Sequence, residues 1–270
     1  LKPVIYGTIV SRFLSISKVI NALAGLGFLF RSQSVKAKCL KFLVRTALKI
    51  VLKSKRCELI LQNPDDLSVL LGLGVNKQQT HLIRGAGVNT DIYKPIGSSP
   101  IVLPIVLIAT RMLWDKGVGV FVDAAKIVNS RGVKATFVLV GEGDEGNLNS
   151  ISKQQLETWN ELEFVEWWGK CSDMPKVLNS ASIVSLPSNY GEGIPKVLIE
   201  AASCGKPIIT TDTPGCREIV NNKVNGFLID VNNAEQLADK VIQLINSPEL
   251  GVKMGQEGRK MVCNHFSIEK

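Results

Sequence analysis

Histidine is scarce in this chain, and its cysteines follow no regular spacing. The 270 residues include two histidines, His81 and His265, and six cysteines, at positions 39, 57, 171, 204, 216 and 263, without a C-x-x-C pair. Two distant histidines and scattered cysteines do not provide the ligand spacing of a zinc site. A serine, histidine and acid arrangement typical of hydrolases is also missing. These absences predict a reduced protein that needs no metal and no cofactor.

The sequence has no apolar run long enough to cross a bilayer. The longest stretch, Val19 to Phe30, is interrupted by Asn21 and two glycines, whereas a spanning helix needs about 20 predominantly apolar residues. The start of the chain also lacks the charged, apolar and small-residue regions of a secretory signal. We therefore expect a cytoplasmic protein, and peripheral attachment to the inner face of the plasma membrane stays open.

Acidic residues are absent from one segment, residues 31–56. Nine of the 32 lysines and arginines fall there, which leaves 23 basic against 24 acidic residues in the rest of the chain. The net charge of +8 therefore belongs to this basic segment. Within it Lys41, Arg45, Lys49 and Lys53 recur every four positions. This spacing predicts an amphipathic helix with a basic face.

The sequence supports two interpretations of this basic helix. Clustered lysines and arginines suit an anionic membrane surface. A plain surface helix that packs on its sheet explains the pattern equally well, because the other face is apolar and consists of Leu40, Leu43, Val44, Ala47, Leu48, Val51 and Leu52. Nucleic acid is not expected as a partner, since no aromatic residues are interleaved with the charges to form a stacking face.

Two glutamates eight positions apart enclose a loop that runs into an apolar helix. Glu192 and Glu200 bracket the sequence Gly-Ile-Pro-Lys-Val-Leu-Ile. Pro195 suits the first helical position, because its missing N–H is not needed there and its φ is preset. The free N–H groups and positive dipole end of such a helix favour a phosphate. Both carboxylates can then accept hydrogen bonds from the hydroxyls of one ligand, as a sugar and a ribose would offer.

Short apolar runs on either side of the glutamates predict buried strands at 183–186, 208–210 and 227–229. Between the last two, the residues from Asp212 to Gly215 are expected to open a further helix that carries Arg217 and Glu218. With Glu192 and Glu200 inside this order of elements, the chain resembles the retaining glycosyltransferases of the family 4 type, which carry an E-x7-E signature. The resemblance implies an α/β GT-B fold with two Rossmann-like, doubly wound parallel-sheet domains.

A second element agrees with the resemblance. The apolar run 105–109 is followed by Arg111, Lys116 and an amphipathic stretch over 118–128. In the resembled family, an arginine and a lysine at this spacing contact the donor diphosphate. A guanidinium and an ammonium at the carboxyl end of a strand can neutralise the charge that develops on a departing diphosphate. An isolated pair of this kind would ordinarily be interpreted as solvated loop cations.

The resemblance assigns roles to residues in three loops. Arg111, Lys116 and Glu192 would be catalytic. The donor would also be bound by Gly141 and Glu142, in the turn after a strand at 138–140, and by Gly193, Ile194, Pro195 and Glu200. A metal is not implied, since two cations and a helix end can stabilise the diphosphate.

Two tryptophans stand where members of the family contact the nucleotide base. Trp167 and Trp168 lie in the segment 164–170. An aromatic residue beside a strand is more often part of the core than a stacking surface. We therefore leave both tryptophans out of the predicted site.

The chain is expected to divide into an acceptor-side domain, residues 1–95, and a donor-binding domain, residues 96–270. In the first we expect helices at 2–15, 34–55 and 65–71 and strands at 19–23, 59–62 and 81–83. A Rossmann-like domain usually takes roughly 100 to 150 residues. We therefore interpret the chain as a fragment with an incomplete first domain that also stops before the last helix of the family.

The function implied by the resemblance is retaining transfer of a hexose or N-acetylhexosamine from a UDP-sugar to a lipid-linked or polysaccharide acceptor, in bacterial cell-surface glycan synthesis. Many members have a histidine in the first domain that touches the donor sugar, and Ala24 stands at that position here. A nucleotide-sugar epimerase of the same fold is an alternative, although the two histidines are poorly placed for it. A fragment that binds UDP without catalysis is another alternative.

Overall fold

A computed structural model describes residues 2–26, 35–54, 56–97, 103–189 and 193–268, with side chains left out at 35–41. By its internal contacts the chain forms two compact units. The first comprises residues 1–85 and 190–195, and the second comprises residues 86–189 and 196–270. Each unit is an α/β structure with a parallel sheet, as the resemblance implies.

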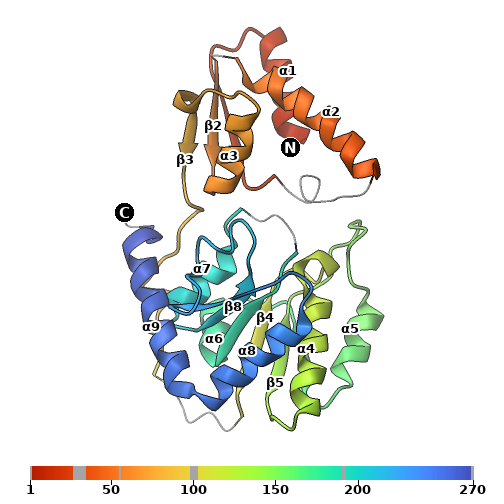
Figure 1. Ribbon diagram of the computed structural model, residues 1–270, viewed down its shortest axis with the longest axis vertical. Helices are drawn as coiled ribbons and strands as arrows, with labels where there is room; N and C mark the ends of the chain where they lie inside the picture. The colour runs from red at the N-terminus through yellow and green to blue at the C-terminus, as the bar shows by residue number, and fades with distance from the viewer. Residues whose placement is uncertain (1, 27–34, 55, 98–102, 190–192, 269–270) are drawn as a thin grey trace. The chain divides into compact units, whose positions relative to one another are not determined.

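The first unit has a three-stranded parallel sheet in the order β1-β2-β3, with helices between the strands. All six elements expected from the sequence are present (Figure 1). In chain order they are α1 (Lys2–Phe13), β1 (Val19–Leu23), α2 (Val35–Leu52), β2 (Cys57–Leu61), α3 (Pro64–Gly72) and β3 (Thr80–Leu82), and a short 3-10 helix that was not predicted, η2 (Lys77–Gln79), precedes β3.

The core of the first unit forms between its sheet and helix α2. Alternate residues of β2, including Leu59 and Leu61, are buried, and Leu48 and Leu52 of α2 belong to the same cluster. These two leucines confirm part of the predicted apolar face. Leu43, however, is 58% exposed, because the described apolar contacts of α2 are concentrated in its last two turns.

The second unit has a six-stranded parallel sheet in the order β6-β5-β4-β7-β8-β9, the order of a Rossmann-type domain. Helices cover both faces; α4 packs beside α8, and α7 packs beside α9 (Figure 1). The strands are β4 (Ile105–Ala109), β5 (Thr136–Val140), β6 (Val165–Gly169), β7 (Ile183–Leu186), β8 (Ile208–Thr211) and β9 (Gly226–Ile229). The helical elements are η3 (Trp114–Lys116), α4 (Val118–Ser130), α5 (Lys153–Asn160), α6 (Met174–Ser180), α7 (Lys196–Ser203), α8 (Ala234–Asn246) and α9 (Pro248–His265).

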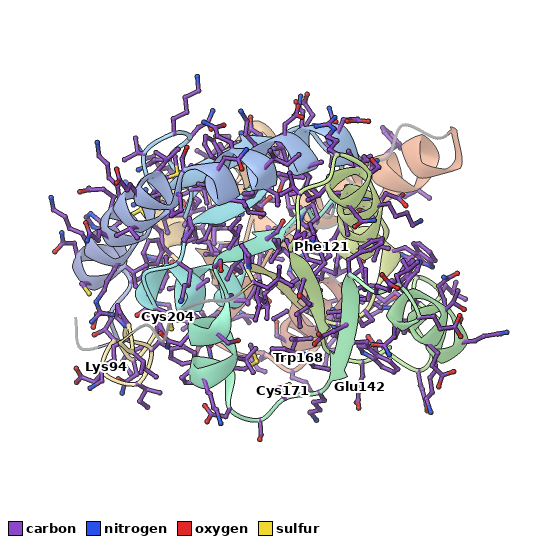
Figure 2. All side chains as sticks on the ribbon, turned by 90° about the horizontal axis from the view of Figure 1, so that it is seen from below. Lys94, Phe121, Glu142, Trp168, Cys171 and Cys204 are labelled. Carbon is purple, nitrogen blue, oxygen red and sulfur yellow. The ribbon has the colours of Figure 1, made fainter. Side chains whose placement is uncertain are left out.

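The central strands of this sheet are buried and mostly apolar because helices cover them on both faces. Every residue of β7 and β8 is buried, and Phe121 of α4 lies in the interior against Phe137 of β5 (Figure 2). The strand order reverses between β4 and β7. In open α/β sheets this reversal places a crevice at the carboxyl ends of the strands, where ligands bind.

The helix expected after Asp212 does not form. Residues 214–219 make successive turns instead, closed by the bonds from Arg217 N to Thr213 O and from Val220 N to Cys216 O. Gly215 has a φ of +83°, which lies outside the right-handed helical region. The sequence indicated a helix start here because proline followed aspartate and threonine, but this glycine interrupts it.

The second unit begins at Ala86, ten residues before the boundary expected from the sequence. Residues 86–97, here named the connecting segment, are held by the second unit. The amide of Val88 donates to Phe266 O at 2.8 Å, and the Asn179 amide donates to Lys94 O at 3.0 Å. These bonds explain why the connecting segment belongs with the sheet of the second unit.

Candidate functional site

A pocket of about 400 Å³ opens at the carboxyl ends of β4, β5 and β6 in the second unit. The loop after β4 contributes Arg111, the loop after β5 contributes Gly141 and Glu142, and α7 contributes Glu200. Lys170 and Cys171 complete it from the loop after β6, and Figure 2 shows Glu142 and Cys171 at the same edge of the unit. Since α7 follows β7, the pocket extends from the ends of β6, β5 and β4 to the point between β4 and β7 where the strand order of the sheet reverses.

The glycine turn after β5 is fixed against the loop after β4. Gly141 has a φ of +135°, and a Cβ atom there would lie 1.9 Å from the carbonyl oxygen of Thr110. The Trp167 indole N–H donates to Gly141 O at 2.8 Å, and the amide of Met112 donates to Glu142 O at 2.8 Å. Only glycine fits at position 141, because any side chain would collide with the neighbouring backbone.

Arg111 reaches the pocket from an exposed position and is held there by Asp144. The guanidinium Nη1 lies 2.5 Å from Asp144 Oδ2, and the arginine side chain is 61% exposed. The amide of Asp144 in turn donates to Ser150 Oγ at 2.9 Å. The carboxylate therefore orients the guanidinium, and part of its fork is left to contact an anion.

Lys116 is not among the described residues that line this pocket. It is the last residue of η3, directly before α4, and its side chain is half-buried. The pocket wall, as far as the structure describes it, includes Arg111 but not Lys116.

Glu200 is a buried acid with two defined contacts. The residue is 7% exposed, Lys196 Nζ lies 3.5 Å from Oε1, and the Tyr93 hydroxyl hydrogen-bonds to the carboxylate. Burial raises the pKa of Glu200 above its ordinary value, and the contacts with Tyr93 and Lys196 partly oppose this change. Burial and the charge of Glu200 also raise the pKa of Tyr93 to about 12, so the phenol keeps its proton and is the donor.

The loop before α7 belongs to the first unit. Gly193, Ile194 and Pro195 are buried, and the amide of Ile194 donates to Gln62 Oε1 at 3.1 Å. Helix α7 begins at Lys196. Pro195 therefore lies immediately before the helix, whereas the sequence predicted it at the first helical position. The predicted contacts of this loop with a diphosphate need a free amide, and that of Ile194 is engaged by Gln62. Glu192 lies outside the described residues.

Trp168 does not lie in the core, contrary to the expectation from the sequence. Strand β6 is the edge strand of its sheet, and Trp168 is 36% exposed there, with its indole N–H donating to Glu166 Oε2 at 2.7 Å. Its neighbour Trp167 is half-buried and supports the glycine turn through Gly141. An edge strand has no further strand beside it, and this position lets Trp168 face outward.

A second cavity, of about 380 Å³, lies at the other end of the same sheet. It opens at the amino ends of β4, β7 and β8 and is lined mainly by apolar residues, among them Pro104, Ile183, Pro207 and Leu244. Ligands of open α/β sheets bind at the carboxyl ends of the strands. The pocket with Arg111 and Glu200 is therefore the better candidate for the functional site.

Metal ligands and membrane-spanning helices were also sought in the described residues. No group of three or more histidine, cysteine, aspartate or glutamate side chains in the described ranges is placed to hold a metal ion. Within the same ranges, the helices are too short or too polar to cross a membrane.

Two Rossmann-type units and a charged pocket at the switch point of the second sheet define the GT-B class of glycosyltransferases. Residues 94–261 match the family described as Glycosyl transferases group 1. The match covers more than half of the chain, and the chain therefore belongs to this glycosyltransferase family.

Two curated relatives match nearly the whole chain. It is 30% identical over 263 residues to the N,N'-diacetylbacillosaminyl-diphospho-undecaprenol alpha-1,3-N-acetylgalactosaminyltransferase of Campylobacter jejuni, covering 93% of this chain and 67% of the relative. It is 25% identical over 281 residues to the UDP-Gal:alpha-D-GlcNAc-diphosphoundecaprenol alpha-1,3-galactosyltransferase of Escherichia coli, covering 100% of this chain and 70% of the relative. The chain thus spans about two thirds of the length of these relatives.

A solved structure supports the fold assignment. The HepE protein of Anabaena, crystallised with UDP and glucose, has a TM-score of 0.80 to this chain at 20% identity, covering 99% of this chain and 72% of the other. At this identity the likeness concerns the fold.

The sequence did not single out two residues that contact predicted site residues. Asp144 follows the glycine turn and pairs with Arg111, and Tyr93 of the connecting segment hydrogen-bonds to Glu200. An acid three residues after Gly141 was a usable signal for the first. Nothing local in the sequence links Tyr93 to a helix more than 100 positions further on.

Proposed function

We propose that this chain carries the donor site of a retaining glycosyltransferase that uses a UDP-sugar. The observation that supports the proposal best is that Arg111 and Glu200 line one pocket at the switch point of a Rossmann-type sheet. An arginine suits the diphosphate of such a donor, and a buried carboxylate suits the paired hydroxyls of its ribose.

The proposed roles follow from the position and charge of each group. Arg111 would stabilise the negative charge that develops on the departing diphosphate, with Lys116 as a second cation. Gly141 lines the pocket and has no side chain, so a donor could approach its backbone closely. Glu192 is assigned to the hydroxyls of the donor sugar and Glu200 to the ribose.

The proposed reaction requires no protein base and no metal. The acceptor oxygen forms a bond to the anomeric carbon on the face from which the diphosphate leaves. The bond between that carbon and the diphosphate oxygen breaks, and the hydroxyl proton passes to the departing diphosphate. The configuration at the anomeric carbon is therefore retained, and cationic side chains supply the charge stabilisation that a metal ion gives elsewhere.

The donor sugar is proposed to be a hexose or N-acetylhexosamine, and the acceptor a lipid-linked or polysaccharide glycan of the bacterial cell surface. The names of the Campylobacter and Escherichia relatives support this choice, because they specify N-acetylgalactosaminyl and galactosyl transfer to sugars on diphosphoundecaprenol. Such an acceptor lies in a membrane, so we also propose a cytoplasmic protein that attaches peripherally to the inner face of the plasma membrane.

Product analysis tests the proposed function. The protein would be incubated with radiolabelled UDP-N-acetylgalactosamine or UDP-galactose, with and without an undecaprenyl-diphosphate-linked sugar. We expect labelled lipid only when the acceptor is present, and NMR should show an axial anomeric linkage as in the donor. A changed sugar on UDP without transfer would indicate an epimerase. UDP binding without transfer would indicate a fragment that binds the nucleotide only, and an inverted linkage would contradict the retaining mechanism.

A further inference from the structure

The connecting segment fixes Tyr93 beside helix α7. Ser203 Oγ donates a hydrogen bond to the carbonyl oxygen of Tyr93, and the guanidinium of Arg259 donates to the same oxygen at 3.1 Å. Further along, Asn179 donates to Lys94 O at 3.0 Å and accepts from the amide of Ile96 at 2.9 Å. Tyr93 therefore has backbone anchors at its own carbonyl and at the residues that follow it.

These anchors place the Tyr93 ring on the side of α7 that carries Glu200. Ser203 follows Glu200 by three positions, so both residues lie on one face of the helix. The Tyr93 hydroxyl hydrogen-bonds to the Glu200 carboxylate. Lys94 and Cys204 lie near each other in Figure 2, and Asn179 contacts both, with its amide 3.6 Å from Cys204 Sγ.

Tyr93 acts on a residue that lines the pocket. Glu200 belongs to the pocket wall, whereas Tyr93 does not appear in the wall as the structure describes it. A glutamate side chain has three rotatable bonds, and ordering it for a ligand costs up to about 2 kcal/mol. A hydrogen bond from a fixed phenol removes part of this cost before the ligand arrives.

We propose that Tyr93 is the positioning residue of Glu200, and that its phenol holds the carboxylate toward the pocket in its ionised form, ready for the ribose hydroxyls of a uridine nucleotide. This inference rests on the proposed function. A carboxylate that accepts two hydroxyl groups must be ionised and correctly turned. The phenol serves both needs, because a hydrogen bond to the ionised carboxylate stabilises the charge and leaves further lone pairs for the ligand.

Other charged groups also act on this carboxylate and on the phenol. Lys196 lies beside it on α7, and Cys204 follows the last residue of this helix. Asp173, which caps α6, faces the phenol. The remaining charged or titratable groups in the described pocket wall are Arg111, Glu142, Lys170 and Cys171.

Calorimetric titration with UDP tests the inference through a double-mutant cycle. We expect Tyr93→Phe to weaken UDP binding about tenfold, the scale of one hydrogen bond to a charged group. Glu200→Gln should weaken binding as well, and adding Tyr93→Phe to it should cause little further loss, because the phenol then has no carboxylate to hold. Tyr6→Phe, an exposed position on α1, is the control for loss of a phenol hydroxyl and should bind as the wild type does.

The pH dependence separates positioning from a merely structural role. The Tyr93 bond lowers the pKa of Glu200 against the effect of burial. Its removal should therefore move the acid limb of UDP binding to higher pH. The phosphate groups of UDP titrate alike with both proteins, so the difference between the midpoints reports the protein. Phenylalanine keeps the ring and the anchored carbonyl, and melting curves check that the fold is intact.

The outcomes distinguish this inference from the function on which it rests. Wild-type protein that does not bind UDP would overturn both. Wild-type binding that Tyr93→Phe leaves unchanged in affinity and in midpoint would overturn the role of Tyr93 alone. Equal losses from Tyr93→Phe in the wild-type and Glu200→Gln backgrounds would also reject it, because the tyrosine would then act independently of the glutamate.

Discussion

At the scale of single residues, the candidate site depends on side chains whose neighbours determine their charge and direction. Arg111 is turned by Asp144, and Glu200 is held by Tyr93 and Lys196. The first pair is largely solvent-exposed, where ion pairs add little to stability. The pairing with Asp144 therefore matters for a ligand because it orients the Arg111 guanidinium.

Arg111→Ala tests the proposed charge stabilisation. We expect the rate of sugar transfer to fall by a factor of about 10² or more, the scale of losing one group that stabilises developing charge. Lys116→Ala should act in the same direction. The control is Arg131→Ala, since Arg131 is also exposed and paired, with Glu235 and Asp239, but contacts α8 rather than the pocket. Initial rates that Arg111→Ala and Lys116→Ala leave at the wild-type level would refute the assignment.

Glu200→Gln separates binding from stability. The folded protein raises the pKa of Glu200, so it binds this proton more tightly than the unfolded chain, whose glutamates have a pKa of about 4.3. Stability from this group is therefore full at low pH and is lost as the pH rises from the ordinary to the raised pKa. We expect melting temperatures of the variant to equal or exceed those of the wild type near neutrality, and the difference to shrink toward acid pH. A variant that melts far below the wild type at neutral pH would show that the charged form supports the fold.

At the scale of elements, the proposed peripheral attachment would use the exposed face of helix α2. Phe42, Arg45, Lys49, Ile50 and Lys53 recur at spacings of one to four residues that bring them to one side of the helical segment. Each of these five residues is exposed, whereas Leu48 and Leu52 are buried in the first unit. Basic and large apolar groups on one exposed face favour an anionic lipid surface over bulk solvent.

Charge reversal on α2 tests membrane attachment. We expect the double variant Arg45→Glu and Lys49→Glu to bind phosphatidylglycerol vesicles at least tenfold more weakly than the wild type, at about 1 kcal/mol for each basic residue near the surface. Lys253→Glu with Lys260→Glu makes the same charge change on the exposed side of α9 and serves as the control. Vesicle flotation measures both. Equal retention of the two double variants would support the alternative of a plain surface helix.

At the scale of the whole molecule, the sequence predicted the elements better than their contacts. The strands at 105–109 and 183–186 were predicted with the same bounds that the structure shows, because continuous apolar runs between turn residues leave few other possibilities. The prediction of a helix after Asp212 was wrong because the conformation of Gly215 depends on its surroundings. Trp168 was placed in the core because the sequence does not reveal that its strand lies at the edge of the sheet.

The sequence also predicted part of the candidate site. Arg111, Gly141, Glu142 and Glu200 were selected by motif, and they line one pocket because parallel strands end at a common edge. Tyr93 escaped notice because four strands of the sheet lie between it and Glu200 in the chain. Partnerships of this kind depend on the three-dimensional arrangement, and periodicity or spacing cannot reveal them.

The strand order of the second unit also has a consequence for the growing polypeptide on the ribosome. Strands β4, β5 and β6 emerge first and form one half of the sheet, and β7, β8 and β9 then add on the free side of β4. Domains fold progressively as they are synthesised, so a half-sheet that already carries Arg111 and the glycine turn precedes α7. Nascent chains arrested before residue 200 should therefore contain the phosphate-facing wall but fail to retain a nucleotide.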